Sequence, residues 1–127
     1  ISARTLKFIH QSKTAALLTS SLKLGAMSAG ATDKKVQHLE EFGQCTVLAF
    51  QVIDDILDVT QSSETLGKSA GKDEAVNKAT YPAIHGLDKS KRLAEKLTKQ
   101  AINALKPFKS KGKRLEELAN YLLDREY

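Results

Sequence analysis

An apolar run from residue 46 to residue 59 contains three carboxylates, Asp54, Asp55 and Asp58. Acidic side chains are rarely buried unless they are paired or bind a metal. On a helix, Gln51, Asp54 and Asp58 fall on one face, and Asp55 lies beside that face. Packed like charges repel one another, so we expect a cation there. Mg²⁺ suits this position, because it prefers oxygen ligands and is usually held by one or two carboxylates together with substrate phosphates.

The length and composition bound the fold class. A chain of 127 residues is at most one domain, and 41% apolar with 6% aromatic residues and no Trp fits a helical core. The lone Cys45 excludes an internal disulfide framework, is consistent with a reducing compartment, and is interpreted as an inert core thiol. No apolar stretch approaches the length of a transmembrane segment. Because the chain starts at Ile1, we treat it as a fragment or a processed form.

The net charge of +5 comes from the last third of the chain. Residues 1–87 carry nine basic and nine acidic side chains, whereas residues 88–127 carry eleven basic and six acidic ones. Such an excess is typical of contact with nucleic acid or an anionic surface. The lysines are, however, spread through amphipathic helices without interleaved aromatics, so we interpret them as a solvated helical face.

Helical periodicity accounts for the first half of the chain. The spacing predicts one helix from Thr5 to about Met27 and a second that begins after a cap at Thr32 or Asp33. Apolar residues then recur at i, i+3 and i+4 as far as residue 59, and from residue 46 onward they lie nearly all round, as expected for a central buried helix. No alternation of period two occurs, so the prediction is an all-α fold without strands.

The second half is predicted to hold a long loop and three more helices. Residues 60–80 are rich in Ser, Thr, Gly and Lys, and a loop of that length is usually functional or disordered. Pro82 opens a short helix and Asp88 caps a stronger one. Pro107 and Gly112 then break the helical pattern before a last amphipathic helix around residues 115–122.

Lysines supply candidate phosphate ligands. Lys68, Lys72 and Lys78 lie in the predicted loop, where mobile cations could reach phosphate oxygens, although each could equally be plain surface lysine. Lys13 stands beside Thr14 at the start of an apolar turn, where it could reach a buried anion or simply extend to solvent. The three histidines are scattered without metal-ligand spacing, so we interpret them as structural or surface groups.

Taken in order, these motifs resemble the C-terminal half of a trans-isoprenyl diphosphate synthase, with geranylgeranyl and farnesyl diphosphate synthases the most similar. The resemblance covers residues 5 to about 98 well and rests on Lys13-Thr14, Phe50-Gln51, Asp54-Asp55-Ile56-Leu57-Asp58, Leu66-Gly67-Lys68, Gly71-Lys72-Asp73 and Asn77-Lys78-Ala79-Thr80-Tyr81-Pro82. It implies that residues 1–127 are the C-terminal part of a single all-α domain of the isoprenoid synthase type. In that family two aspartate-rich motifs on facing helices hold Mg²⁺ and the diphosphate of an allylic substrate.

The resemblance also implies residue roles and a reaction. The enzyme would be a prenyltransferase that condenses isopentenyl diphosphate with an allylic diphosphate through ionisation, condensation and elimination. Asp54 would be the principal Mg²⁺ ligand, supported by Asp55 and Asp58 of the second aspartate-rich motif. Allylic diphosphate would be bound by the catalytic residues Lys13 and Lys68 and by Lys78, with Gln51 and Thr14 orienting the site, Phe50 near the homoallylic substrate, and Lys72 and Asp73 assisting loop closure.

The chain departs from the family pattern because it lacks the first aspartate-rich motif; no second Asp-Asp-x-x-Asp occurs in the 127 residues. The basic residues that seat isopentenyl diphosphate are missing as well. We therefore expect a homodimer or a heterodimer, a missing N-terminal half or a partner chain, and an apolar surface where the absent helices pack. The expected compartment is cytoplasmic, with a plastid as the alternative.

Two interpretations from other classes stay open. A non-catalytic prenyltransferase-like subunit that modulates an active partner would explain the missing first motif, but the intact acidic motif argues against it. A basic helical nucleic-acid module would have to use residues 88–127, and it gives the acidic motif no role. We therefore expect no nucleic-acid partner and no transmembrane segment.

Overall fold

The computed structural model describes residues 1–65 and 80–125, apart from the side chains of residues 62–65. The regular elements in these ranges are all helical, which confirms the all-α prediction. In chain order they are α1 (Ala3–His10), the π-helical turn η1 (Gln11–Ala15), α2 (Ala16–Ser28), α3 (Asp33–Thr65), α5 (Tyr81–His85), α6 (Leu87–Ala104), the 3₁₀ segment η2 (Lys106–Gly112) and α7 (Lys113–Leu123).

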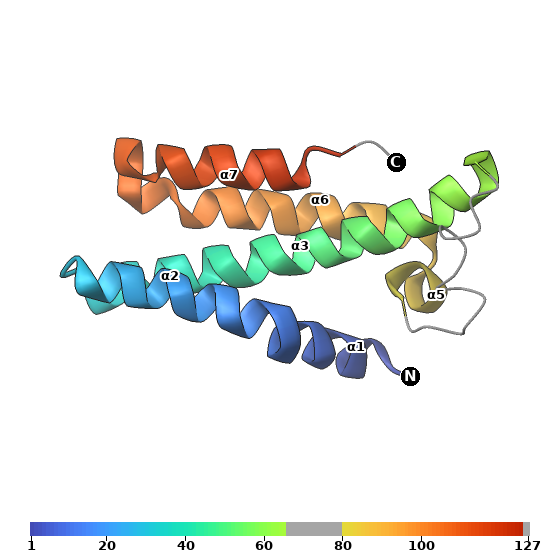
Figure 1. Cartoon of the computed structure of the whole chain (residues 1–127), viewed down its shortest axis with the longest axis horizontal. Coiled ribbons are helices and arrows are strands. Elements are labelled where there is room, and N and C mark those ends of the chain that lie inside the picture. The colour runs from blue at the N-terminus through green and yellow to red at the C-terminus, as the bar shows by residue number, and fades with distance from the viewer. Residues whose placement is uncertain (66–79, 126–127) are drawn as a thin grey trace.

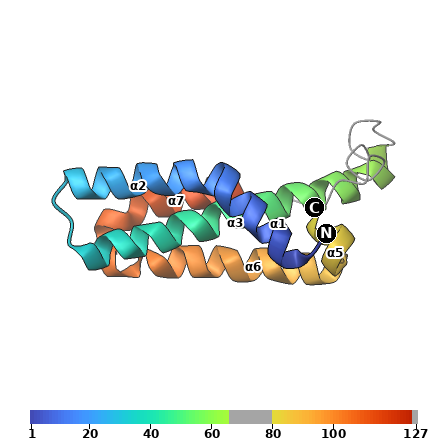
Figure 2. The same ribbon diagram turned by 90° about the horizontal axis from the view of Figure 1, so that it is seen from below.

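The long helices lie side by side, and successive ones run in opposite directions (Figures 1 and 2). Helix α3 is central, because it contacts every other helical element of the described chain. Both ends of the described chain and the short α5 lie toward the end of the bundle where α3 finishes (Figures 1 and 2). None of the helices within the described ranges is long and apolar enough to cross a membrane.

The helix predicted from Thr5 to Met27 is present as α1, η1 and α2, which follow one another without a break from Ala3 to Ser28. Gly30, with a positive φ of 77°, ends this helical segment. Its N–H donates to the carbonyl of Met27 at 3.0 Å, and the Ala31 N–H donates to the carbonyl of Ala26 at 3.0 Å. This bond pattern is a Schellman turn, which needs a left-handed residue and so favours glycine.

Helix α3 confirms the prediction of one central helix, and it extends further than predicted. Thr32 caps it, because its Oγ1 accepts a hydrogen bond from the Lys35 N–H at 3.3 Å. The helix continues to Thr65, so the prediction of a loop was wrong for residues 60–65. Polar residues lower helix propensity without ending a helix, and no Gly or Pro interrupts this stretch before Gly67.

Helix α5 begins at Tyr81, one residue before Pro82, and α6 begins at Leu87, two residues earlier than a cap at Asp88 would give. Thr80 caps α5, because its Oγ1 accepts from the Ala83 N–H at 3.2 Å, and Pro82 occupies the first turn. Gly86, with φ 85°, links α5 to α6. Asp88 therefore lies in the first turn of α6 rather than at its cap, a position where its charge still favours the helix dipole.

Two apolar clusters hold the bundle together, and both are built on α3. The first joins the second half of α3 to α5, α6, α1 and the end of α7. The second joins the first half of α3 to the ends of α2 and α6 and to α7. Cys45 packs against both clusters and is half-buried, in agreement with its interpretation as a core thiol. Because both clusters contain residues of α3, each neighbouring helix is positioned by its packing against α3.

Candidate functional site

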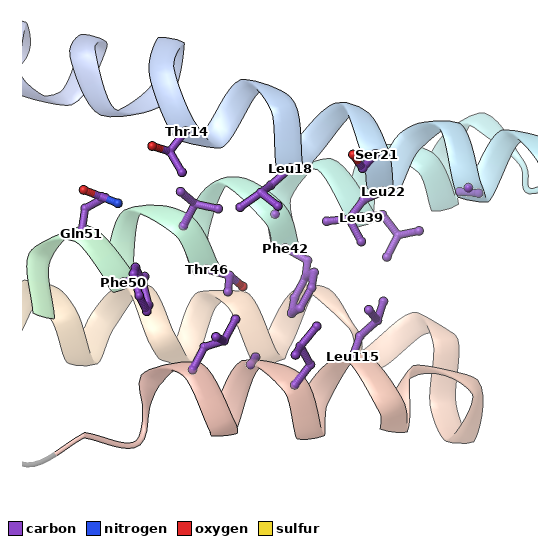
Figure 3. A pocket seen from close by; sticks show the side chains of 17 residues that line it. Thr14, Leu18, Ser21, Leu22, Leu39, Phe42, Thr46, Phe50, Gln51 and Leu115 are labelled. Atoms are coloured by element: carbon purple, nitrogen blue, oxygen red, sulfur yellow. The ribbon is translucent and has the colours of Figure 1, made fainter. Parts of the chain in front are cut away.

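An apolar groove of about 710 Å³ lies between α2, α3 and α7 (Figure 3). Its walls are mainly apolar side chains, which are joined by a few small polar ones. The lining residues include Leu18, Leu22, Leu39, Phe42, Val47, Phe50, Leu115, Leu118 and Leu122. A concave, largely apolar space with a few polar groups is the usual form of a small-molecule site.

Thr14 and Gln51 place polar atoms toward one end of the groove, and Phe50 stands beside Gln51 (Figure 3). Thr14 belongs to the π-helical turn η1, whereas the other two belong to α3. π-helical turns inside α-helices occur frequently at functional sites, because the extra residue per turn re-aims a side chain. The structure thus brings together three of the residues that the sequence singled out, although they come from separate helices.

Asp54 lies one turn beyond Gln51 and Phe50 on α3 and is bound by a residue near the end of the chain. The Nη1 atom of Arg125 donates to Oδ1 of Asp54 at 2.5 Å. The same guanidinium lies over the ring of Phe50, 5.3 Å from the ring centroid. One cation therefore contacts both the acidic motif and a residue that lines the groove.

Asp55 faces a different neighbour. Its Oδ2 accepts a hydrogen bond from the Tyr81 N–H, at 3.0 Å, so the carboxylate holds the first turn of α5. Burial, and secondarily the charge of Asp55, raises the pKa of Tyr81 to about 12. The Tyr81 ring lies 5.5 Å from that of His10 and 5.8 Å from that of His85. These two histidines thus stack beside a core side chain, in agreement with their interpretation as structural or surface groups.

The acidic motif has the oxygen ligands to form one side of a binding site for a hard cation. Asp54, Asp55 and Asp58 are all half-buried, so none is sealed from a ligand. Their oxygen donors are those that Mg²⁺ prefers, and one or two carboxylates with substrate phosphates are its usual ligand set. Across the part of the chain that the structure describes, however, no three His, Cys, Asp or Glu side chains gather closely enough to hold a metal ion by themselves.

Of the lysines predicted to bind phosphate, Lys13 alone lies within the described residues. Lys13 is exposed on η1, next to the groove-lining Thr14. Lys68, Lys72, Asp73 and Lys78 lie outside the described residues. In the last third of the chain most lysines are exposed, in agreement with a solvated helical face.

Arg125 is the residue that sequence reasoning missed. In the sequence it is one of the eleven basic residues of the last third of the chain, and 71 residues separate it from Asp54. No motif or spacing links two positions so far apart. The sequence signal that was present, an arginine just after the last apolar residues of an amphipathic helix, is too common to single it out.

Comparison with known proteins gives a family match over nearly the whole chain. Residues 1–122 match the family model for polyprenyl synthetase. The chain is 51% identical over 127 residues to the chloroplastic geranylgeranyl pyrophosphate synthase of Capsicum annuum, and it covers 34% of that protein. It is 52% identical over 122 residues to the chloroplastic heterodimeric geranylgeranyl pyrophosphate synthase large subunit 1 of Arabidopsis thaliana, covering 95% of this chain and 33% of that one.

Solved structures agree in fold. A putative farnesyl-diphosphate synthase from Marinomonas sp. MED121 is 38% identical with a TM-score of 0.81, over 98% of this chain and 41% of that one. A geranyltransferase from Helicobacter pylori, complexed with magnesium and isoprenyl diphosphate, is 35% identical with a TM-score of 0.71, again over 98% and 41%. The chain thus spans about a third of the length of the curated relatives it matches.

Proposed function

Because the chain belongs to the polyprenyl synthetase family, we propose that it carries the second half of the active site of a prenyl diphosphate synthase. The enzyme would be of the geranylgeranyl or farnesyl type, and it would join isopentenyl diphosphate to an allylic diphosphate. The observation that carries the proposal is the apolar groove, whose lining residues include Thr14, Phe50 and Gln51. Phe50 and Gln51 lie one helical turn before Asp54 on α3. The site therefore has an apolar part and a polar end, and a prenyl diphosphate likewise has an apolar chain and an anionic head group.

The groove would receive the prenyl chain. In the reaction the allylic C–O bond breaks and the diphosphate leaves with the electron pair. The alkene of isopentenyl diphosphate then forms the new C–C bond, and the resulting cation loses a proton to the released diphosphate. The apolar walls that include Leu18, Phe42 and Leu115 would exclude water from the allylic cation, which would otherwise be hydrolysed.

The polar end would bind the head group. Gln51 and Thr14 would orient the diphosphate, and Lys13, on the same turn as Thr14, would add a positive charge. Lys68 and Lys78 are proposed to complete the anion site on the basis of the family motif. Phe50 would pack near the homoallylic substrate, and Lys72 and Asp73 would assist loop closure.

Asp54, Asp55 and Asp58 would hold Mg²⁺ together with diphosphate oxygens, and Mg²⁺ would supply the positive charge that stabilises the leaving group. Of the three, Asp54 is proposed as the principal ligand on the basis of the family motif. The named magnesium complex of the Helicobacter pylori relative supports the choice of metal.

A further part of the enzyme would cover this half. Large apolar side chains stand exposed on α2 and α7, among them Leu17, Leu24, Met27 and Tyr121. Apolar surface of this kind usually marks an interaction site. The occupant would be the first half of the active site, in the same polypeptide or in a partner of a homodimer or heterodimer, and the heterodimeric subunit named among the relatives supports the latter class. The chloroplastic relatives support a plastid as the compartment.

The test is a pair of variants in the natural protein that contains residues 1–127, with its partner if it has one. Asp54→Ala should lower the turnover of isopentenyl and allylic diphosphates by about 10²-fold or more, because one contact to the developing charge is lost. It should also weaken Mg²⁺-dependent binding of inorganic diphosphate. Glu117→Ala, an exposed acid on α7, is the matched control and should change neither quantity. Equal kinetics for Asp54→Ala and the control would refute the assignment.

If the chain instead belongs to a non-catalytic subunit, the same variants distinguish it. Asp54→Ala would then leave the activity of the assembled enzyme unchanged, whereas variants in the partner would abolish it.

A further inference from the structure

The backbone conformation of the segment after α7 directs Arg125 toward Asp54. Leu123, the last residue of α7, is buried in the first apolar cluster. Asp124 then has φ −81° and ψ 78°, and the Arg125 N–H donates to the carbonyl of Leu123 at 3.0 Å. These angles and this bond define an inverse γ-turn, which reverses the chain within three residues. The turn places Arg125 two residues from a buried anchor, so its guanidinium is held near α3.

We propose that this turn is a latch, in which Arg125 holds the carboxylate of Asp54 and must release it before Asp54 can bind a metal ion. The inference rests on the proposed function, because it takes Asp54 as a metal ligand. A guanidinium at 2.5 Å from Oδ1 occupies one of the two oxygens and repels an approaching dication. Arg125 is therefore a positioning residue that acts through Asp54.

The exposure of the pair makes the latch displaceable. The side chains of Arg125 and Asp54 are 36% and 43% exposed, respectively. Ion pairs with such access to water contribute little to stability, and salt weakens them further. A divalent ion with diphosphate can therefore displace the guanidinium, whereas a fully buried pair would resist exchange.

Phe50 connects the latch to the groove. Its side chain lines the groove, and the guanidinium of Arg125 lies over its ring at 5.3 Å. Cation–π contact favours this position while the ring stays in place. A ligand that moves the Phe50 ring from within the groove would thus loosen the same arginine that holds Asp54, so that occupation of the groove promotes metal binding.

The experiment measures metal binding without substrate in the natural protein. Mn²⁺ is the probe, titrated by electron paramagnetic resonance against wild type, Arg125→Gln and Arg114→Gln. Arg114 is an exposed arginine at the start of α7, so its variant has the same change of charge. We expect Arg125→Gln to bind Mn²⁺ about twofold to fivefold more tightly than wild type at low salt, which corresponds to the strength of an exposed ion pair. High salt should reduce the difference, and Arg114→Gln should match wild type.

Two further variants separate the possible outcomes. Arg125→Lys keeps the charge, so it should bind Mn²⁺ more weakly than Arg125→Gln. Unchanged or weaker binding in Arg125→Gln would overturn the latch, and weaker binding would instead indicate that Arg125 binds ligand. Asp54→Ala tests the proposed function itself: if it binds Mn²⁺ like wild type, the metal assignment fails, whereas a loss of binding with an unchanged Arg125→Gln removes the latch alone.

Discussion

The Tyr81 N–H donates a hydrogen bond to Oδ2 of Asp55 at 3.0 Å, and this bond ties the start of α5 to the central helix α3 across 26 residues. The neighbouring Asp54 is bound instead by the exposed Arg125. Consecutive residues of a helix point about 100° apart, so two adjacent aspartates face two different parts of the molecule. Asp55 thus has a structural bond that Asp54 lacks.

This difference predicts unequal effects on stability. Asp55→Ala should lower the free energy of unfolding by about 1–3 kcal/mol, because it leaves the half-buried N–H of α5 without its acceptor. Asp54→Ala should lower it by about 1 kcal/mol or less, as expected for an exposed ion pair. Urea denaturation of both variants measures the difference. Equal losses would show that the hydrogen bond to Tyr81 does not anchor α5.

Stability should fall at alkaline pH because of Tyr81. Its side chain is 3% exposed, and burial raises its pKa from the usual 10 to about 12. Below pH 10 the hydroxyl is neutral in both states, so its contribution is fully present. Between pH 10 and pH 12 the unfolded chain ionises first, and on the order of 2–3 kcal/mol is lost.

Tyr81→Phe is the control for this pH dependence. The Tyr81 hydroxyl is buried and has no hydrogen-bond partner among the described residues, so its removal should cost little at pH 7. The difference between wild type and variant should change between pH 10 and pH 12, and thermal melts at a series of pH values measure it. Parallel curves over that range would contradict the assignment.

Gly43 is the point of close approach between α2 and α3. A Cβ atom on Gly43 would lie 2.8 Å from Cδ1 of Leu22 and 3.1 Å from Oγ1 of Thr19. The end of the Leu22 side chain can move aside, but Thr19 is buried and cannot. Gly43→Ala should therefore destabilise the protein, because about 1–3 kcal/mol of overpacking against Thr19 outweighs the 0.5–1 kcal/mol gained from helix propensity. Gly25→Ala is the matched variant, since nothing lies within 4 Å of its Cβ position. Chemical denaturation should show a gain for Gly25→Ala, and a gain for both would refute the close contact.

Cys45 should react slowly with alkylating reagents. Burial, followed by the charge of Glu41, raises the pKa of the Cys45 thiol, although Lys7 opposes the shift. Since the thiolate is the reactive form, fewer molecules react at pH 8 than in the unfolded chain. The rate of iodoacetamide labelling, with and without urea, measures this. Labelling at the same rate in both conditions would contradict the interpretation as a core thiol.

Residues 1–127 alone should not condense isopentenyl diphosphate with an allylic diphosphate. The chain carries one acidic wall, and each missing electrostatic contact in such a site costs roughly 10²–10³ in rate. The test uses radiolabelled isopentenyl diphosphate, short allylic diphosphates and Mg²⁺, and compares this chain with the natural protein. Extension at a comparable rate by the short chain would show that one wall is sufficient.

Much of the architecture could be predicted because helix formation depends on neighbouring residues. Apolar spacing at i, i+3 and i+4 located α3, and Thr32 and Pro82 marked helix starts. The end of α3 was predicted too early, because the polar residues 60–65 break the apolar pattern without breaking the helix. The positions of Gln51, Asp54 and Asp58 along one helix were equally local, and so was the family motif.

The contacts of the acidic motif were decided by the tertiary structure. The sequence by itself determined that Asp54 and Asp55 lie on a buried helix, because a repeat of 3.6 residues is a property of a short segment. It did not determine that Arg125 binds Asp54 or that Tyr81 binds Asp55, because each pair joins segments far apart in the chain. The Arg125–Asp54 pair forms only after α7 packs against α3, and the Tyr81–Asp55 pair only after α5 does. The groove exists only once α2 and α7 lie beside α3.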